Sequence, residues 1–333
     1  MSQSSLRSPM TAVSSRMRAY FAAVDRSAES ATIFDPAKHG MFNLEAPPSP
    51  WVDLGWIGNF ARFCGTTIEV AGAGSPVAPV RQCRSSLTGR VEFDFFEWGK
   101  LQMALAGGAQ HMNVLDADPN SEAQPSGGTP RAALALLPGS TASELVLGTG
   151  AVNSFAVDDL LAVDTDYQQQ TGYIGTGLSA ACVRDPQDVL RDVNYVRRVT
   201  FNVGRVAGKT ASSVLLAQPL LGGAPAPSAA AQKVVAFIDR EGGSFFQEWS
   251  ALFVHQEQSG GRICFYYPRL SPSAPHANDQ TGYEREHRVA ISSPLGAIAL
   301  HASFLALPYT DRNDNETVLC YHAYFPAPGA AIY

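Results

Sequence analysis

Hydrophobic and charged residues alternate along residues 90–95, directly before a change of period. The three apolar side chains fall on one face of a predicted strand and the three charged ones on the other. The apolar positions are Val91, Phe93 and Phe95, and the charged ones are Arg90, Glu92 and Asp94. This pattern predicts an amphipathic strand with one face against a core.

The alternation ends at Phe96, and the next apolar residues follow a helical period. Trp98, Leu101 and Leu105 recur at helical spacing until Gly107-Gly108 stop the run. Residues 51–108 therefore predict a strand, a turn, a second strand and a short helix. A long strand that leads into a short helix favours a role in assembly over catalysis.

Three parts of the chain differ in character. Residues 1–50 form a predicted extended N-terminal arm, which begins Ser-rich and ends in APPSP. Apolar residues near its end indicate that something covers it: Ile33, Phe34, Met41, Phe42 and Leu44. Residues 132–182 carry short apolar runs at intervals of about ten residues, which is typical of a small β-barrel or sandwich. We interpret 132–182 as an inserted β domain, within a main β domain of residues 51–131 and 183–333.

The second half repeats a theme of long hairpins. Residues 185–206 predict a turn or two of helix followed by a strand, and residues 208–233 predict an exposed loop. Strands follow between 234 and 270, with hairpin turns at 241–243 and 259–261. The last segment predicts one alternating strand, a turn at 311–316 and a final strand. The fold class is therefore mainly β.

Composition narrows the class of protein. Charged residues make up 16% of the 333 residues, and Gly and Pro together number 51, which favours an oligomeric β-rich structural protein over a helical enzyme. The net charge of −6 argues against a nucleic-acid binder with a basic groove, although DNA could still pass without being held. Five scattered cysteines favour reduced thiols. We expect neither a signal peptide nor a membrane span.

Catalytic and metal-binding motifs are weak. The chain contains no GxSxG, HExxH, P-loop or GxGxxG pattern. The run DRNDNE at 311–316 matches the start of a calcium loop, but Glu316 stands where Gly is needed, so a turn explains it better. Acidic residues at 158–159 and 164–166 could bind a divalent ion, and they are also typical of strand ends. We expect no enzyme activity, no cofactor and no metal.

A pair of carboxylates supports a second hypothesis, in which the protein binds or processes glycans. Asp239 and Glu248 lie near aromatic residues, so a β-sandwich that binds or processes glycans is the alternative. A capsid-associated cement protein is a third possibility.

The runs WVDLGWIGNF, PVR and VEFDFFEWGKLQMALAGG resemble the tail tube proteins of long-tailed bacteriophages and related phage-like particles. The resemblance covers roughly residues 45–115 and, more weakly, 190–325. It implies a tail-tube-like β-barrel or sandwich with a short helix, whose subunits share an inner barrel in rings, typically hexamers. The rings would stack and contact other tail proteins, and genomic DNA would pass through the lumen. The expected location is the virion tail, after synthesis in the host cytoplasm.

The resemblance brings no active site, so the candidate functional residues are interface anchors. They are Trp51, Trp56, Trp98, Trp249, Tyr266 and Arg198. The alternative for each aromatic residue is a place in the core of its own chain. The long chain and the long arm depart from a minimal tube subunit, so a tube-initiating or distal ring protein also fits.

Overall fold

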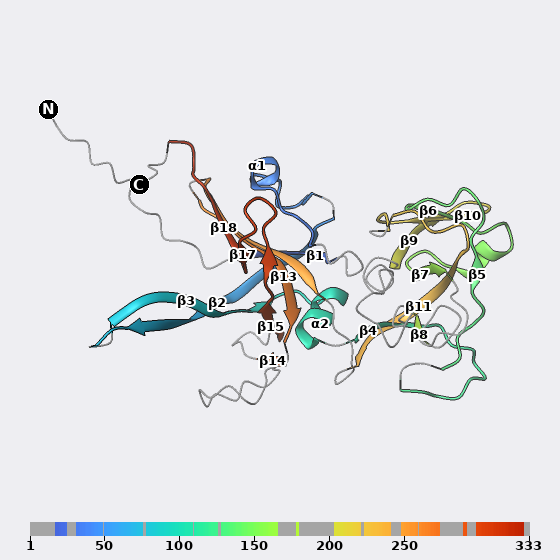
Figure 1. Ribbon diagram of the computed structural model, residues 1–333. Coiled ribbons are helices and arrows are strands. Elements are labelled where there is room, and N and C mark those ends of the chain that lie inside the picture. The colour runs from blue at the N-terminus through green and yellow to red at the C-terminus, as the bar shows by residue number, and fades with distance from the viewer. Residues whose placement is uncertain are drawn as a thin grey trace. The chain divides into compact units, whose positions relative to one another are not determined.

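The computed structural model of this protein divides into two compact units, each described here by itself (Figure 1). Unit 1 comprises residues 1–25, 29–107 and 247–333, and unit 2 comprises 26–28 and 108–246. Of the described residues, 53% lie in strands and 7% in helices, which confirms the mainly β prediction. The structure describes residues 17–24, 31–48, 50–75, 78–108, 110–125, 128–165, 178–179, 203–220, 223–240, 248–258, 260–273, 289–291 and 298–329.

Unit 1 is built on one antiparallel sheet of eight strands in the order β14-β15-β3-β2-β1-β12-β13-β18. Its strands are β1 (Met17–Ala23), β2 (Val52–Ala73), β3 (Ala78–Phe95), β12 (Trp249–Gln256), β13 (Arg262–Pro272), β14 (Val289–Ile291), β15 (Ile298–Ala306) and β18 (Tyr321–Phe325). A small separate hairpin joins β16 (Tyr309–Thr310) to β17 (Thr317–Val318). The turn of this hairpin confirms the prediction for 311–316.

A short seam closes the sheet of unit 1 on itself. Residues Leu270–Pro272 of β13 pair with Phe304–Ala306 of β15. Six strands therefore form a closed ring, β15-β3-β2-β1-β12-β13, whereas β14 and β18 extend beyond the seam. Closure removes most of the free edges of this sheet.

Aromatic side chains fill the interior of this barrel. Phe93 stacks on Phe304 at 5.7 Å between ring centroids and lies 5.2 Å from Phe253. Phe21 completes the cluster with edge-on and tilted contacts. Val91, Phe93 and Phe95 are all fully buried, which confirms the apolar face predicted for residues 90–95, while Glu92 on the other face is also buried and pairs with Arg90.

The N-terminal region is part of unit 1 and does not form an extended arm over its described residues. Residues 17–23 form β1, which pairs with both β2 and β12. Phe34, with Phe42 beside it, packs on Trp51 and Tyr266 on the outer face of the barrel. The helix α1 (Pro36–His39) starts here, with Asp35 as its N-cap. The chain's own sheet therefore covers Phe34, Phe42 and Leu44, whereas Ile33 and Met41 remain more than half exposed.

Helix α2 (Lys100–Gly107) follows β3 as the sequence predicts. Leu101 and Leu105 are buried, and Gln102 donates a hydrogen bond from Nε2 to the carbonyl of Leu54 at 3.3 Å. The helix is thereby fixed to the start of β2.

Unit 2 is a second antiparallel sheet in the order β6-β10-β9-β7-β11-β4-β8, with β5 paired to β11. Its elements are β4 (Gln110–Leu115), β5 (Leu134–Ala135), β6 (Glu144–Val146), a 3₁₀ turn (Ala151–Ser154), β7 (Leu160–Thr165), β8 (Leu178–Ser179), β9 (Val203–Lys209), β10 (Ser213–Leu216) and β11 (Ala229–Arg240). Leu145, Leu161, Val206 and Val214 lie at the centre of its core.

The second unit is wider than the insertion expected at 132–182. It takes in β4 and β9 to β11, which the sequence analysis assigned to the main domain. The reason is β11, which pairs with β4, β5 and β7 and so draws both flanks into one sheet.

The prediction of an exposed loop at 208–233 is wrong in part. Val214 and Leu216 of β10 point into the core of unit 2, and β11 begins at Ala229. The helix expected after 185 and the turn at 241–243 lie outside the described residues. The hairpin predicted around 259–261 is confirmed, since β12 and β13 pair in antiparallel fashion up to Gln256 and Arg262, although Ser259 itself lies outside the described residues. Among the described helices, none is long and apolar enough to cross a membrane.

Candidate assembly surface

The outer part of the β2–β3 hairpin projects beyond the barrel (Figure 1). The pairing of β2 with β3 runs from Ile57 with Phe95 to Ala73 with Ala78. However, β1 accompanies β2 only as far as Ile57, and β15 accompanies β3 only from Gly89 onward. Over the described residues of 63–88, the two strands therefore form a ribbon with no further strand paired to it. We call this segment the projecting hairpin.

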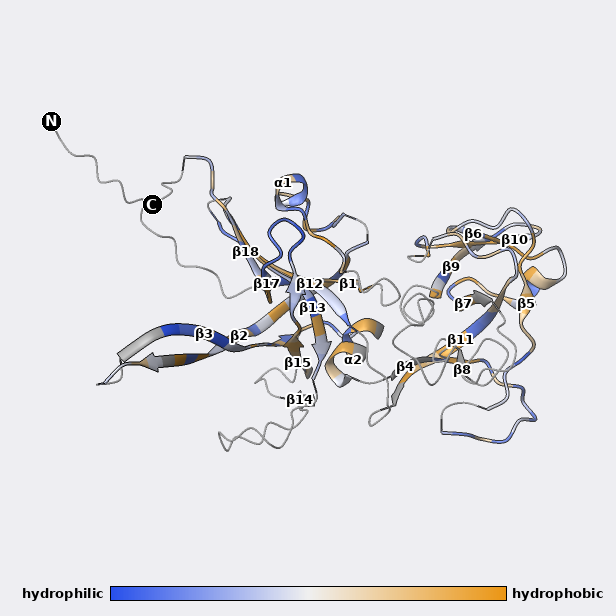
Figure 2. Ribbon diagram, viewed as in Figure 1, coloured by the Kyte–Doolittle hydropathy of each residue, from blue (hydrophilic) through white to orange (hydrophobic). Residues whose placement is uncertain are grey.

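Apolar side chains of the projecting hairpin face solvent. Phe63, Ile68 and Val70 are each more than half exposed, at 53%, 54% and 51%. Figure 2 shows hydrophobic as well as hydrophilic stretches along these two strands. An isolated two-stranded ribbon is marginally stable in water, and exposed apolar side chains on it indicate a surface that a partner covers.

Hydroxyl groups link the two strands of the projecting hairpin. Thr66 donates to the carbonyl of Ser86 at 2.9 Å, and the hydroxyl of Ser86 donates to that of Thr67 at 2.8 Å. Ser85 and Thr88 donate to carbonyls on β2. These cross-strand bonds hold the register of the ribbon where no core supports it.

A second exposed patch lies at the other end of the paired strands. Trp56, Phe96 and Trp98 are 37%, 58% and 52% exposed. The amide of Phe96 donates to the carbonyl of Trp56 at 3.4 Å, so these two residues are neighbours. We call these three residues the aromatic patch. Large exposed aromatic side chains are typical of protein interfaces.

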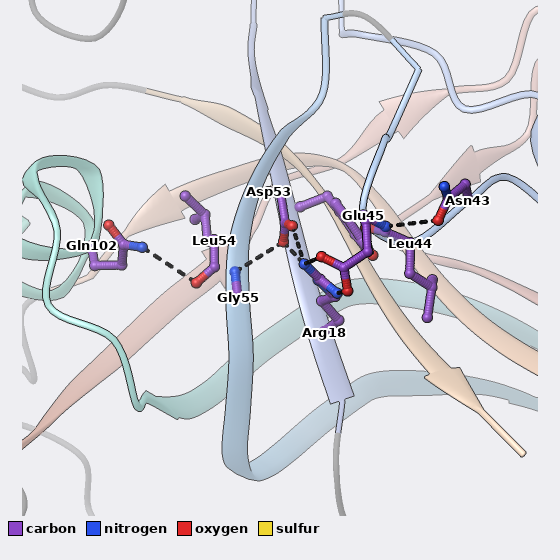
Figure 3. A network of polar contacts seen from close by, with 9 residues as sticks. Arg18, Asn43, Leu44, Glu45, Asp53, Leu54, Gly55 and Gln102 are labelled. Carbon is purple, nitrogen blue, oxygen red and sulfur yellow. Dashed lines mark hydrogen bonds and ion pairs between the residues drawn. The ribbon is translucent and has the colours of Figure 1, made fainter. Parts of the chain in front are cut away.

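Arg18 fixes the strand that carries the aromatic patch (Figure 3). Its guanidinium binds both carboxylate oxygens of Asp53 and both of Glu45, with Nε to Asp53 Oδ1 and Nη2 to Glu45 Oε2 each at 2.9 Å. The same guanidinium lies 5.5 Å from the centre of the Trp56 ring. One buried cation therefore joins β1, the segment before β2 and β2 itself.

Electrostatics around Arg18 follow from these contacts. The hydrogen bonds that Arg18 donates to Glu45 and Asp53 raise the pKa of Arg18, and the bond from Arg18 lowers the pKa of Glu45. Asp53 also accepts the amide of Gly55, whose φ of +81° is the left-handed conformation that suits glycine. The bend at Gly55 directs the backbone into the aromatic patch.

The six predicted anchors divide into three groups. Trp51, Trp249 and Tyr266 are 4–6% exposed and pack within unit 1, so they belong to the core of their own chain. Trp56 and Trp98 are exposed in the aromatic patch. Arg198 lies outside the described residues.

The carboxylates of the glycan hypothesis do not meet in one unit. Glu248 belongs to unit 1 and forms a two-point ion pair with Arg269, at 2.8 and 3.1 Å. Asp239 belongs to β11 of unit 2. The side chain of Asp239 lies outside the described part of the chain.

The acidic candidates for metal binding serve local structure. Asp159 pairs with Lys233 at 2.6 Å and caps the amide of Ala156. Asp311 accepts the Tyr321 hydroxyl at 2.6 Å and the amide of Asn313. No group of three or more His, Cys, Asp or Glu that could hold a metal occurs in the described part of the chain. The side chains of Asp164, Asp166 and Tyr167 lie outside it.

Sequence reasoning missed the apolar residues of the projecting hairpin and Phe96. The signal for the hairpin was the alternation of Thr66, Ile68 and Val70 on one face. It did not reveal exposure, because the same alternation predicts a strand with a buried face.

Comparison with models of known protein families gave no match to this chain, and comparison with curated proteins gave no significant one. The assembly surface therefore has to be interpreted from its own geometry.

Proposed function

We propose that this protein is a virion structural subunit whose rings stack into the tail tube of a phage or phage-like particle. The observation that carries the proposal is the projecting hairpin, a ribbon of residues 63–88 that exposes Phe63, Ile68 and Val70 beyond a closed barrel. Such a hairpin gains stability when a neighbouring copy covers it, because burying the exposed half of each of these side chains contributes about 1 kcal/mol.

Two further features support a ring of identical subunits. In the described residues, β18 pairs with β13 and β14 pairs with β15, and each leaves its other edge open. Open edges of this kind can pair with strands of a second copy. The order of a long hairpin followed by the short helix α2 also agrees with the resemblance to tail tube proteins. In this proposal the rings are hexamers that contact other tail proteins, and DNA passes through the lumen.

Charge favours a second copy as the occupant of the hairpin. The projecting hairpin carries Arg81, Arg84 and Glu69, whereas the whole chain has a net charge of −6. A basic projection on an acidic protein is attracted to another copy of that protein.

The test compares assembly of the wild type with that of a double variant, Ile68→Asp with Val70→Asp. Leu137→Asp with Val157→Asp is the matched control, since both positions are exposed residues of unit 2. Negative-stain microscopy and light-scattering mass of the concentrated protein are measured. We expect rings or hollow tubes from the wild type and the control, and loss of stacking in the hairpin variant. A wild type that stays monomeric at all concentrations, or a hairpin variant that assembles normally, contradicts the proposal.

One observation favours the glycan alternative. A cavity of about 450 Å³ in unit 1 is lined by Phe34, Tyr266, Tyr309 and Tyr321, with Asp311 at its margin. Aromatic faces beside a carboxylate are a usual way to bind sugar rings. A monomeric wild type that binds glycans, and loses binding in Tyr309→Ala, would favour this function over the tube.

A further inference from the structure

A second cavity of unit 1 lies at the base of the projecting hairpin. Its volume is about 240 Å³, and it is lined by the barrel end of the hairpin together with residues 317–322. Gly89 is one of its lining residues, and a Cβ atom there would lie 2.8 Å from the Leu319 side chain. The Leu319 side chain therefore packs directly on the backbone of Gly89 at this point.

Positive charge in this cavity has no counterion among its lining residues. Arg62 and Arg84 line it, and no Asp or Glu does. The Nε–H of Arg62 donates to the hydroxyl of Tyr267 at 3.1 Å, and the Arg62 guanidinium lies 5.3 Å from the centre of the Phe265 ring. Neither partner carries a charge. Phe265 has no ionisable group, and burial raises the pKa of the Tyr267 phenol, which stays protonated at neutral pH.

Two further titratable groups of the cavity, Cys320 and His322, do not supply a negative charge. Burial raises the pKa of the Cys320 thiol to about 12, so this thiol is protonated at neutral pH. Burial, and after it the charge of Arg62, lowers the pKa of His322. Glu316 lines an adjoining cavity with Arg84, but the two form no ion pair in the described part of the chain. A half-buried guanidinium therefore faces a small cavity that an anion can enter.

We propose that this cavity binds an oxyanion, such as a phosphate or a carboxylate, between Arg62 and Arg84. Guanidinium groups bind planar or tetrahedral oxyanions through paired N–H donors, and partial burial strengthens such bonds. The Thr317 hydroxyl and the Tyr267 phenol add polar groups at the wall of the same cavity. The site does not depend on the proposed assembly into tubes, since the residues used here belong to one chain.

The probe is inorganic phosphate, titrated into the full chain against sodium chloride of equal ionic strength. Backbone amide shifts of Thr317 and Leu319 are followed by NMR in the wild type, Arg62→Gln, Arg84→Gln and Arg81→Gln. Arg81 lies on the same hairpin outside the lining residues, so R81Q makes the same charge change as a matched control. R62Q could also weaken binding by disturbing the packing of Arg62 on Phe265. R84Q serves as the second test variant, because Arg84 is exposed and its replacement leaves the core packing unchanged.

We expect saturable shifts in the wild type and R81Q, and binding weakened by about tenfold or more in R62Q and R84Q, which corresponds to about 1.4 kcal/mol. Shifts that do not saturate, or R62Q and R84Q curves that match the wild type, overturn the site. An equal loss in R81Q also overturns it, because the effect would then be one of general charge.

Sedimentation in phosphate and in chloride separates two sources of the oxyanion. Association that falls in phosphate and in R62Q, but not in R81Q, assigns the site to a carboxylate of a second copy. Association that is the same in both salts and in R62Q assigns it to a free oxyanion. Both results require the saturable shifts above.

Discussion

Arg18 shows how one side chain can determine the position of several segments. Its side chain is 8% exposed and is bound by two carboxylates, of which Glu45 is 74% exposed and Asp53 is 23% exposed. A buried cation without partners is costly, so the fold needs these carboxylates at the edge of the barrel. The carboxylate of Asp53 in turn accepts the amide of Gly55 at the bend, and the backbone amide of Glu45 donates to the side chain of Asn43 in the segment before β2.

Replacement of Arg18 by Met should destabilise unit 1. The substitution leaves Asp53 without its main partner, and breaking a buried pair costs about 3 kcal/mol or more. Trp fluorescence during urea unfolding measures the change, because all four Trp residues belong to unit 1. Arg312→Met, an exposed position of the same unit, is the control and should change stability by no more than about 0.5 kcal/mol. Equal effects of the two substitutions would show that the network adds no stability.

The projecting hairpin is stabilised by local cross-strand bonds, whereas the barrel ends of the same strands are also stabilised by tertiary packing. Near the barrel, β2 also pairs with β1 and β3 also pairs with β15. Beyond Gly89, β2 and β3 pair only with each other in the described residues. Cross-strand hydroxyl bonds replace the support that a core gives. Local stability should therefore fall along one continuous pair of strands.

Hydrogen exchange should detect this gradient. In dilute protein, amides of residues 63–88 should exchange much faster than those of residues 91–95, whose apolar side chains lie in the barrel interior. On concentration into assemblies, the hairpin amides should become protected and those of 91–95 should change little. Mass spectrometry of peptides from the two ranges measures both states. Hairpin amides that are already protected in the monomer would contradict a role for assembly in covering them.

At the scale of the whole molecule, two separate cores divide the chain. The barrel of unit 1 is assembled from residues on both sides of unit 2, whereas β11 gathers unit 2 from residues 108–246. Each core contains fully buried leucines, Leu252 in unit 1 and Leu145 in unit 2.

Matched Leu→Ala substitutions should affect the two cores separately. Leu252→Ala should lower the free energy of unfolding detected by Trp fluorescence by about 2–5 kcal/mol. Leu145→Ala should leave the unfolding transition detected by Trp fluorescence unchanged. It should shift the unfolding transition of unit 2, which far-ultraviolet circular dichroism detects because both units contribute to that signal. A shift of the Trp transition by Leu145→Ala of the same size would mean that the chain unfolds as one cooperative unit.

The sequence by itself determined the local elements with strong periodicity. Alternation over 90–95 and the helical spacing of Leu101 and Leu105 predicted β3 and α2, because side-chain period depends on backbone geometry alone. The turns at 259–261 and 311–316 were predictable for a related reason, since Gly, Asn and Asp suit the backbone of turns.

Tertiary structure alone decided which surfaces are buried. Trp51, Trp249 and Tyr266 could not be told from interface anchors, because aromatic side chains suit both a core and an interface. Segment 31–44 packs on the outer face of β12 and β13, so that β12 is buried on both sides. Likewise, Ile68 and Val70 follow a pattern of burial and remain exposed, since no third strand accompanies the hairpin. Domain boundaries and side-chain exposure depend on pairing between strands that are distant in sequence. A local pattern of apolar and polar residues carries no information about that pairing.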